Sequence, residues 1–180
     1  MNTTATTPSA TDPSTSPDRY CRIASPVGEL TVVRRGVELV GLYFPHHRPA
    51  PAPGSLGTPT TDGFEECMSE LDEYFSGVRH GFGVAFRAVG PPADERVWAR
   101  VAEIPYGRTT TYGRIAGELG GGITAQEVGA AVARNPLCIL VPCHRVIGAT
   151  GALTGYAGGV DRKRYLLELE QRVSGDPRLF

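Results

Sequence analysis

The residues most able to do chemistry lie in one short stretch, the Pro-Cys-His-Arg motif at 142–145. A cysteine thiol has a pKa of about 8.5, so only a few per cent is thiolate at neutral pH, and an imidazole within reach can take its proton. The preceding run at 138–141 is apolar and strand-like, and Pro142 offers no backbone N–H to extend it. We therefore expect Cys143 where a buried element breaks, a position that can hold a reactive side chain rigidly.

Two interpretations of Cys143 are open at this point. A buried cysteine more often acts as a small hydrophobic side chain than as a nucleophile. The adjacent proline, histidine and arginine favour a nucleophile here, but they do not by themselves name a reaction.

Size and composition limit the class of protein. A length of 180 residues suits one domain of ordinary size or two small ones, and a hydrophobic fraction of 41% is enough for a core. No run of about 18 apolar residues is present, which predicts no membrane span. The N-terminus lacks the basic and apolar regions of a signal peptide.

The cysteines indicate a reducing compartment. They are Cys21, Cys67, Cys138 and Cys143. Because their spacing forms neither a CxxC pair nor a dense disulfide framework, we expect reduced thiols and a cytoplasmic protein. His46, His47 and His80 do not join them in a metal-ligand pattern, so we expect no metal.

The charge distribution is more informative than the formal net charge of −1. Lys and Arg number 11 against 9 acids after Gly90, and 7 against 10 acids before it, so the second half is the better face for an anion. The excess is small, which predicts modest and salt-sensitive binding to DNA. Lys163 is the only lysine, and every other basic side chain except histidine is a guanidinium.

The first half of the chain predicts a small α/β unit after a tail. Residues 1–18 are rich in Thr, Ser, Pro and Ala and are expected to be disordered. The expected elements are strands over 30–33 and 37–44 in an antiparallel meander, a loop over 46–62, a helix over 64–75 and a last strand over 82–86. Asp62 is the expected cap of the helix, its acids form a solvated face, and His46 and His47 are expected in solvent. The inward face of the helix is expected to consist of Cys67, Met68, Leu71 and Phe75.

The second half is denser in helix, and Pro91-Pro92 marks the boundary between the halves. Helices are expected over 93–104, 112–119, 125–133 and 161–170. Thr111 and Thr124 are the expected caps of the second and third, the latter in a capping box with Glu127. Those two helices, joined by a turn containing three glycines, match a helix-turn-helix pattern. The turn has no following Lys-Ser/Thr, which excludes a P-loop.

Five motifs in this order can be compared with a known family. They are Ile104-Pro105-Tyr106-Gly107, Tyr112-Gly113, Arg134-Asn135-Pro136, the run from Pro142 to Gly148, and the run from Leu153 to Gly159. Together they resemble the O6-alkylguanine-DNA alkyltransferases, also called methylated-DNA–protein-cysteine methyltransferases. The dense part of the match runs from about Trp98 to Glu170.

The resemblance implies an α/β (α+β) fold of two domains after the tail at 1–18. The first, over 19–90, would be a small ribonuclease-H-like domain, and the second, over 91–175, a winged-helix-like domain with a helix-turn-helix. The expected partner is double-stranded DNA containing alkylated bases, and a damaged base must leave the stack before it can be attacked. The resemblance also implies a monomer that needs no cofactor, because the lesion itself is the alkyl donor.

The resemblance assigns roles to the chemical residues. Cys143 would take the alkyl group from guanine O6, His144 would act as its base through a water, and Glu170 would orient the histidine. Asn135 would fix the loop, and Tyr112 would rotate a phosphate and donate to N3 of the base. The product is a thioether that nothing in the motifs can cleave, so the protein would act once per molecule.

The same comparison assigns the base pocket. Tyr156 would form a wall, the backbone N–H of Ala157 would meet O6, and the carbonyls of Cys143 and Val146 would accept from the exocyclic amine. Arg145 is expected to form a structural ion pair that holds the loop.

Tyr112, Gln126 and Arg134 are the residues expected to contact DNA. The family usually presents an arginine where this sequence has Gln126, which lacks the charge and reach of a guanidinium. Two other functions remain open: a lesion-binding or regulatory protein without efficient transfer, and a hydrolase that uses the cysteine, histidine and glutamate.

Overall fold

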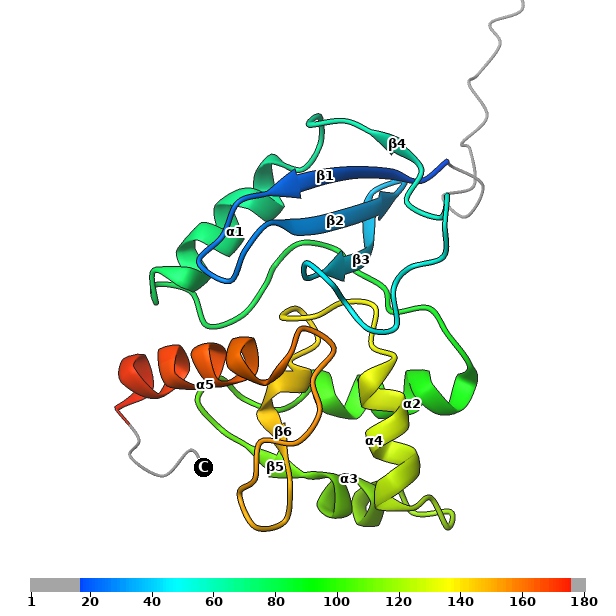
Figure 1. Cartoon of the computed structure of the whole chain (residues 1–180), viewed down its shortest axis with the longest axis vertical. Helices are drawn as coiled ribbons and strands as arrows, with labels where there is room; N and C mark the ends of the chain where they lie inside the picture. The colour runs from blue at the N-terminus through cyan, green and yellow to red at the C-terminus, as the bar shows by residue number, and fades with distance from the viewer. Residues whose placement is uncertain (1–16, 176–180) are drawn as a thin grey trace, which may run out of the picture.

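The computed structural model describes residues 17–175 and has two stacked halves (Figure 1). Residues 1–16 of the tail predicted over 1–18 lie outside the described residues. Asp18, which is described, accepts two hydrogen bonds from Arg35 at 2.6 and 2.8 Å.

A four-stranded sheet forms the upper half in Figure 1. Its strands are β1 (Arg19–Ile23), β2 (Leu30–Arg35), β3 (Glu38–Tyr43) and β4 (Thr58–Pro59), in the order β3-β2-β1-β4. The antiparallel pairing of β2 and β3 confirms the predicted meander, and β1, which was not predicted, pairs antiparallel with β2. Strand β4 runs parallel to β1 within the predicted loop, and its two residues show no strand pattern because pairing alone defines them.

Helix α1 (Glu65–Phe75) lies beside this sheet, but its caps and inward face differ from the prediction. Phe64 occupies the N-cap position without a side-chain bond, so Asp62 is not the cap, and Glu65 instead accepts from the N–H of Gly63 at 3.1 Å. The buried side chains are Cys67, Glu70, Leu71 and Tyr74. Met68, predicted to face inward, is 40% exposed.

The strand predicted over 82–86 is wrong, and Glu70 is the reason. Its buried carboxylate accepts from the backbone N–H groups of Gly83 and Val84 at 2.9 to 3.2 Å, so these groups cannot pair in a ladder. Only Phe86 makes a bridge, to Leu39 of β3. Glu70 also corrects the expectation that every acid of this helix is solvated, because it is buried and pairs with Arg79 at 3.0 Å.

The lower half is mainly helical. Its elements are α2 (Pro92–Ala102), β5 (Thr110–Thr111), α3 (Tyr112–Leu119), α4 (Ala125–Ala133), the short 3₁₀ helix η2 (Cys143–Arg145), β6 (Val146–Ile147) and α5 (Val160–Ser174). Thr111 caps α3 by accepting from the N–H of Arg114, as predicted. Thr124 and Glu127 form the predicted capping box of α4. These two helices therefore begin where the sequence indicates, with a glycine turn between them.

The edge strand β3 joins the two halves. Leu42 donates its N–H to the carbonyl of Pro136 at 2.7 Å and accepts from the N–H of Cys138 at 3.2 Å. A free sheet edge is thereby paired with the segment that leads to Cys143. Buried side chains of both halves form one continuous hydrophobic cluster, so the sheet is part of what holds this segment in place.

In the described part of the chain, no helix is long and apolar enough to cross a membrane. Among the same residues, no group of three or more His, Cys, Asp or Glu side chains is placed to hold a metal ion.

Candidate active site

The segment before Cys143 is a tight turn, which corrects the strand predicted over 138–141. Leu137 and Val141 are joined by a hydrogen bond of 2.8 Å between the N–H of Val141 and the carbonyl of Leu137. Ile139 has φ of 74°, a conformation that is costly for a β-branched residue. Asn135 holds the turn, because its amide donates to the carbonyl of Val141 at 2.9 Å and its side-chain oxygen accepts from Leu137 at 3.0 Å.

Cys143 is the first residue of η2, directly after Pro142, and is only 1% exposed. The pKa of its thiol is lowered, chiefly by its interaction with the thiol of Cys138. Burial opposes this shift, while the Asn135 side chain and the nearby Lys163 cation support it. The site therefore favours a thiolate at Cys143 more than an ordinary buried cysteine would.

His144 and Glu170 are fully buried and meet directly. Nε2 of His144 lies 2.7 Å from Oε1 of Glu170. Burial lowers the pKa of His144, which keeps the imidazole neutral at pH 7, although the carboxylate opposes the shift. The carboxylate only accepts, so Nε2 carries the proton, and Nδ1 has no hydrogen-bond partner among the described residues. This tautomer leaves Nδ1 able to accept a proton.

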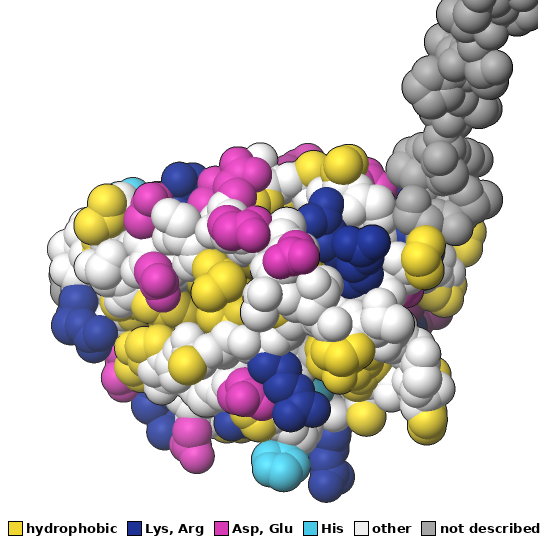
Figure 2. Space-filling view, turned by 90° about the horizontal axis from the view of Figure 1, so that it is seen from above, with side chains coloured by type: hydrophobic (Ala, Val, Ile, Leu, Met, Phe, Trp, Pro, Cys, Tyr) yellow, Lys and Arg dark blue, Asp and Glu magenta, His cyan; other side chains and the backbone are white. Residues whose placement is uncertain are grey.

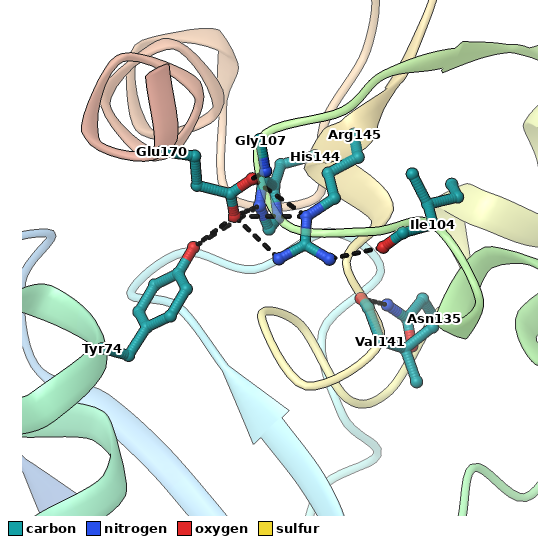
Figure 3. A network of polar contacts seen from close by, with 8 residues as sticks. All are labelled: Tyr74, Ile104, Gly107, Asn135, Val141, His144, Arg145 and Glu170. Carbon is teal, nitrogen blue, oxygen red and sulfur yellow. Dashed lines mark hydrogen bonds and ion pairs between the residues drawn. The ribbon is translucent and has the colours of Figure 1, made fainter. Parts of the chain in front are cut away.

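Glu170 is surrounded by donors from distant parts of the chain (Figure 3). Arg145 donates to both carboxylate oxygens at 2.9 and 3.0 Å and to the carbonyl of Ile104 at 2.6 Å, which confirms the predicted ion pair. The N–H of Gly107 donates at 3.0 Å and the hydroxyl of Tyr74 at 2.8 Å. Burial would raise the pKa of Glu170, but His144 and Arg145 more than offset it and hold it below its usual range.

Strand pairing brings Tyr112 to this site. Strands β5 and β6 pair in parallel, Thr110 with Val146 and Thr111 with Ile147, and Tyr112 follows at once as the first residue of α3. Desolvation raises the pKa of Tyr112, so its hydroxyl stays protonated at neutral pH.

A cavity of about 400 Å³ is lined by residues of α4, by Tyr112 and by the segment 154–157. Four residues predicted for the base pocket or for DNA binding line it together: Tyr112, Gln126, Tyr156 and Ala157. Cys143 and Val146 are not among its lining residues and are buried. Burial is the main cause that raises the pKa of Tyr156, and the charge of Cys143 adds to the shift. Tyr156 lines the cavity, and its hydroxyl is buried without a hydrogen-bond partner among the described residues.

Arg134 lies apart from that cavity. It is the C-cap residue of α4 and donates two hydrogen bonds to Asp94 of α2, at 2.6 and 2.7 Å. Its side chain is 48% exposed, so this pairing leaves part of the guanidinium in solvent.

Two further buried residues lie at the site, although no role there was assigned to them from the sequence. Lys163 donates from Nζ to the carbonyls of Val146 and Thr154 at 2.6 and 3.1 Å, and burial lowers its pKa to about 8. Its position seven residues before Glu170 places both on one helix face, a signal the sequence did contain. Tyr74 had the same kind of signal, since it follows Leu71 by three residues.

The expectation that His47 is solvated is also wrong. His47 is 6% exposed, packs edge-to-face on Tyr43 with ring centroids 5.1 Å apart, and has Nδ1 4.0 Å from the sulfur of Cys138. Desolvation lowers its pKa to about 4, so the buried ring is neutral. The loop around it is fixed by a bond from the N–H of Arg48 to the carbonyl of Ala157 at 3.0 Å.

Comparison with known proteins gives two matching family models. Residues 19–88 match the ribonuclease-like domain of 6-O-methylguanine DNA methyltransferase, and residues 92–172 match its DNA binding domain. The chain is 43% identical over 162 residues to a methylated-DNA--protein-cysteine methyltransferase of Mycobacterium tuberculosis, covering 89% of this chain and 98% of the relative. A relative of the same description from Methanosarcina acetivorans is 49% identical over 107 residues, covering 59% of this chain and 69% of its own length.

Solved structures agree. A crystal structure of Mycobacterium tuberculosis OGT in complex with DNA is 42% identical, with a TM-score of 0.82, and covers 86% of this chain and 94% of that one. A 6-O-methylguanine-DNA methyltransferase from Pyrococcus kodakaraensis, 20% identical with a TM-score of 0.50, shares the fold; 85% of this chain and 98% of that one are covered.

The fold and the site define a class of two-domain proteins, in which a ribonuclease-like domain precedes a DNA-binding domain with a buried cysteine. The chain belongs to the 6-O-methylguanine DNA methyltransferase family.

Proposed function

We propose that this protein repairs DNA by direct reversal, transferring the alkyl group of O6-alkylguanine to Cys143 once per molecule. The observation that carries the proposal is the buried arrangement of Cys143, His144 and Glu170, in which the thiol pKa is lowered and Nδ1 of the imidazole is free to accept a proton. The relatives named methylated-DNA--protein-cysteine methyltransferase support the same activity.

The reaction is a displacement at the alkyl carbon. The proton of Cys143 passes to Nδ1 of His144 through a water, and the negative charge of Glu170 stabilises the imidazolium that forms. The sulfur electron pair forms the C–S bond while the C–O6 bond breaks, and its electron pair leaves with guanine. No group at the site can reverse the resulting thioether, so each molecule reacts once.

The cavity supplies the place for a flipped base. Tyr156 forms a wall, the N–H of Ala157 donates to O6, and the carbonyls of Cys143 and Val146 accept from the exocyclic amine. Tyr112 donates a hydrogen bond to N3 and so offsets the charge of the leaving guanine; its raised pKa keeps the hydroxyl protonated and able to donate. The carbonyl of Val146 already accepts from Lys163 at 2.6 Å, which orients it and leaves its second lone pair for the base.

The helix-turn-helix of α3 and α4 is the proposed DNA-binding side. Gln126 is exposed near the start of α4 and lines the cavity, where it can enter the gap left by the flipped base. Arg134 is exposed at the other end of α4 and can reach a phosphate. Figure 2 shows the side of the molecule formed by the N-terminal half, where acidic and basic side chains are interspersed and neither sign forms a continuous area. That face therefore lacks the continuous basic surface that would bind a DNA backbone.

A monomer is sufficient for this activity, because all the proposed side chains come from one chain. The cysteines are free thiols, which agrees with the reducing conditions of a cytoplasm. Double-stranded DNA with an alkylated base is the proposed substrate.

The test is an intact-mass measurement after incubation with a duplex that carries O6-methylguanine. We expect a gain of one methyl group that is absent in Cys143→Ala, whose folding is checked by circular dichroism. Binding of the duplex without a mass gain would instead identify a lesion-binding protein.

A further inference from the structure

Tyr74 is a side chain of the N-terminal half that reaches the polar cluster around Glu170 (Figure 3). It is fully buried in α1, 96 residues before the glutamate, and its hydroxyl lies 2.8 Å from Oε1 of that carboxylate. The same hydroxyl is 3.5 Å from Nε2 of His144. Its ring is held by the rings of Phe75, Phe82 and Tyr106, with centroids 5.4, 5.4 and 6.0 Å away.

The direction of the hydrogen bond is fixed by chemistry. Burial, and next the nearby Glu170, raise the pKa of Tyr74 well above its usual value, so the hydroxyl keeps its proton. An ionised carboxylate can only accept. Tyr74 therefore donates to Oε1 of Glu170, the same oxygen that accepts from His144 at 2.7 Å.

We propose that Tyr74 is a positioning residue for alkyl transfer, which fixes Oε1 of Glu170 and so holds His144 with Nδ1 directed at its proton donor. This inference rests on the proposed function. It gives the ribonuclease-like domain a part in the chemistry, because a side chain of that domain completes the hydrogen bonds of a carboxylate in the DNA-binding domain.

Removing the hydroxyl should change the basicity of His144. The groups that act on this imidazole are Glu170 and Lys163 of α5, Arg145 of η2 and Tyr74 of α1. A donor to Oε1 draws negative charge from the carboxylate, so without it more charge remains to stabilise the imidazolium. In Tyr74→Phe the pKa of His144 should therefore rise, and less neutral base is present at a given pH.

The experiment compares Tyr74→Phe with Tyr106→Phe in single-turnover methyl transfer from duplex DNA across pH. The hydroxyl of Tyr106 has no hydrogen-bond partner among the described residues, so its removal is a matched control. We expect Tyr74→Phe to be about tenfold slower near neutral pH, a fraction of a typical general-base contribution, with its acid limb moved to higher pH. Tyr106→Phe should keep the wild-type profile. An unchanged acid limb in Tyr74→Phe would overturn the proposal.

A double-mutant cycle tests whether Tyr74 acts through the carboxylate. In a Glu170→Gln background, Tyr74→Phe should cause no further loss of rate, because its partner charge is already gone. An equal loss in both backgrounds would contradict this.

Nitrogen NMR of ¹⁵N-histidine protein provides a test that needs neither DNA nor the variant. Wild-type His144 should be the tautomer protonated at Nε2, and finding Nδ1–H instead would overturn the proposal even if Tyr74→Phe does not fold. If the variant folds, its His144 should titrate at higher pH. A wild-type protein that accepts no methyl group would refute the proposed function, whereas the His144 titration in Tyr74→Phe would still test whether Tyr74 acts on this histidine.

Discussion

Arg145 and Glu170 lie 25 residues apart in the chain and meet in the core, with Nη2 of the arginine 2.9 Å from Oε1 of the glutamate. Both are almost completely buried, and the carboxylate is the acceptor for the donors that surround it. A buried ion pair whose partners are fully hydrogen-bonded is costly to break on one side, because the other charge remains without compensation.

Glu170→Gln should therefore destabilise the protein by about 3–5 kcal/mol, the usual cost of an uncompensated buried charge. Urea denaturation measures this, with the matched variant Glu168→Gln, an exposed acid of the same helix, expected within about 0.5 kcal/mol of wild type. Equal stability of the two variants would show that the pair contributes nothing.

The lowered pKa of Glu170 predicts that the free energy of unfolding depends on pH in the acid range. The pKa of Glu170 is lower in the folded protein than the value of about 4.3 expected when unfolded. Its stabilising contribution is therefore fully present above that value and is lost as pH falls towards the folded pKa. The difference in unfolding free energy between wild type and Glu170→Gln should shrink between pH 5 and pH 3, measured by urea denaturation. A constant difference would contradict the lowered pKa.

Cys138 should control the reactivity of Cys143. Because the interaction with the Cys138 thiol is the largest cause that lowers the pKa of the Cys143 thiol, Cys138→Ala should raise that pKa, and Cys138→Ser should restore part of the shift through its hydroxyl. The pH dependence of thiolate absorbance or of alkylation by iodoacetamide measures both. Cys21→Ala, which removes a buried thiol of the sheet, is the control and should leave the midpoint of Cys143 unchanged.

Because Lys163 is buried, the free energy of unfolding should be lower at neutral pH than at high pH. Its pKa falls from 10.5 to about 8 on burial, so the unfolded chain holds the proton more tightly than the folded protein between these values. Stability should then rise with pH across that window, by up to about 1.4 kcal/mol per unit. Lys163→Met should lack this rise, and comparing the two by urea denaturation from pH 8 to 10 cancels the other titrating groups. Parallel curves would show that the lysine does not titrate there.

Gln126→Arg should strengthen DNA binding and help to flip the alkylated base into the cavity. An arginine at this exposed position adds charge and reach beside the cavity, so we expect about tenfold tighter binding to duplex DNA and faster duplex repair. Reaction with free O6-methylguanine base should hardly change, because no flipping is needed. Gln171→Arg on α5 adds the same charge away from the cavity and is the control. An unchanged duplex rate in Gln126→Arg would refute this role.

The sequence was sufficient for those features that depend on local order. The caps at Thr111 and Thr124 follow from residue types at fixed spacing, and both were predicted correctly. The motif order around Cys143 identified the family, because comparing motifs along the chain requires no knowledge of which distant segments meet. The predicted strand over 138–141 failed because the side chain of Asn135 turns the backbone, and periodicity cannot register such a bond.

Only the tertiary structure decided which charges are buried and what they contact. Glu70 and Glu168 both look like exposed helix acids in the sequence, yet Glu70 is buried on backbone N–H groups while Glu168 is exposed. Tyr74 joins Glu170 across 96 residues, a contact that depends on how two domains pack. The reason is physical: spacing fixes the face of a helix on which a side chain lies, whereas its burial, partners and protonation depend on what packs against that face.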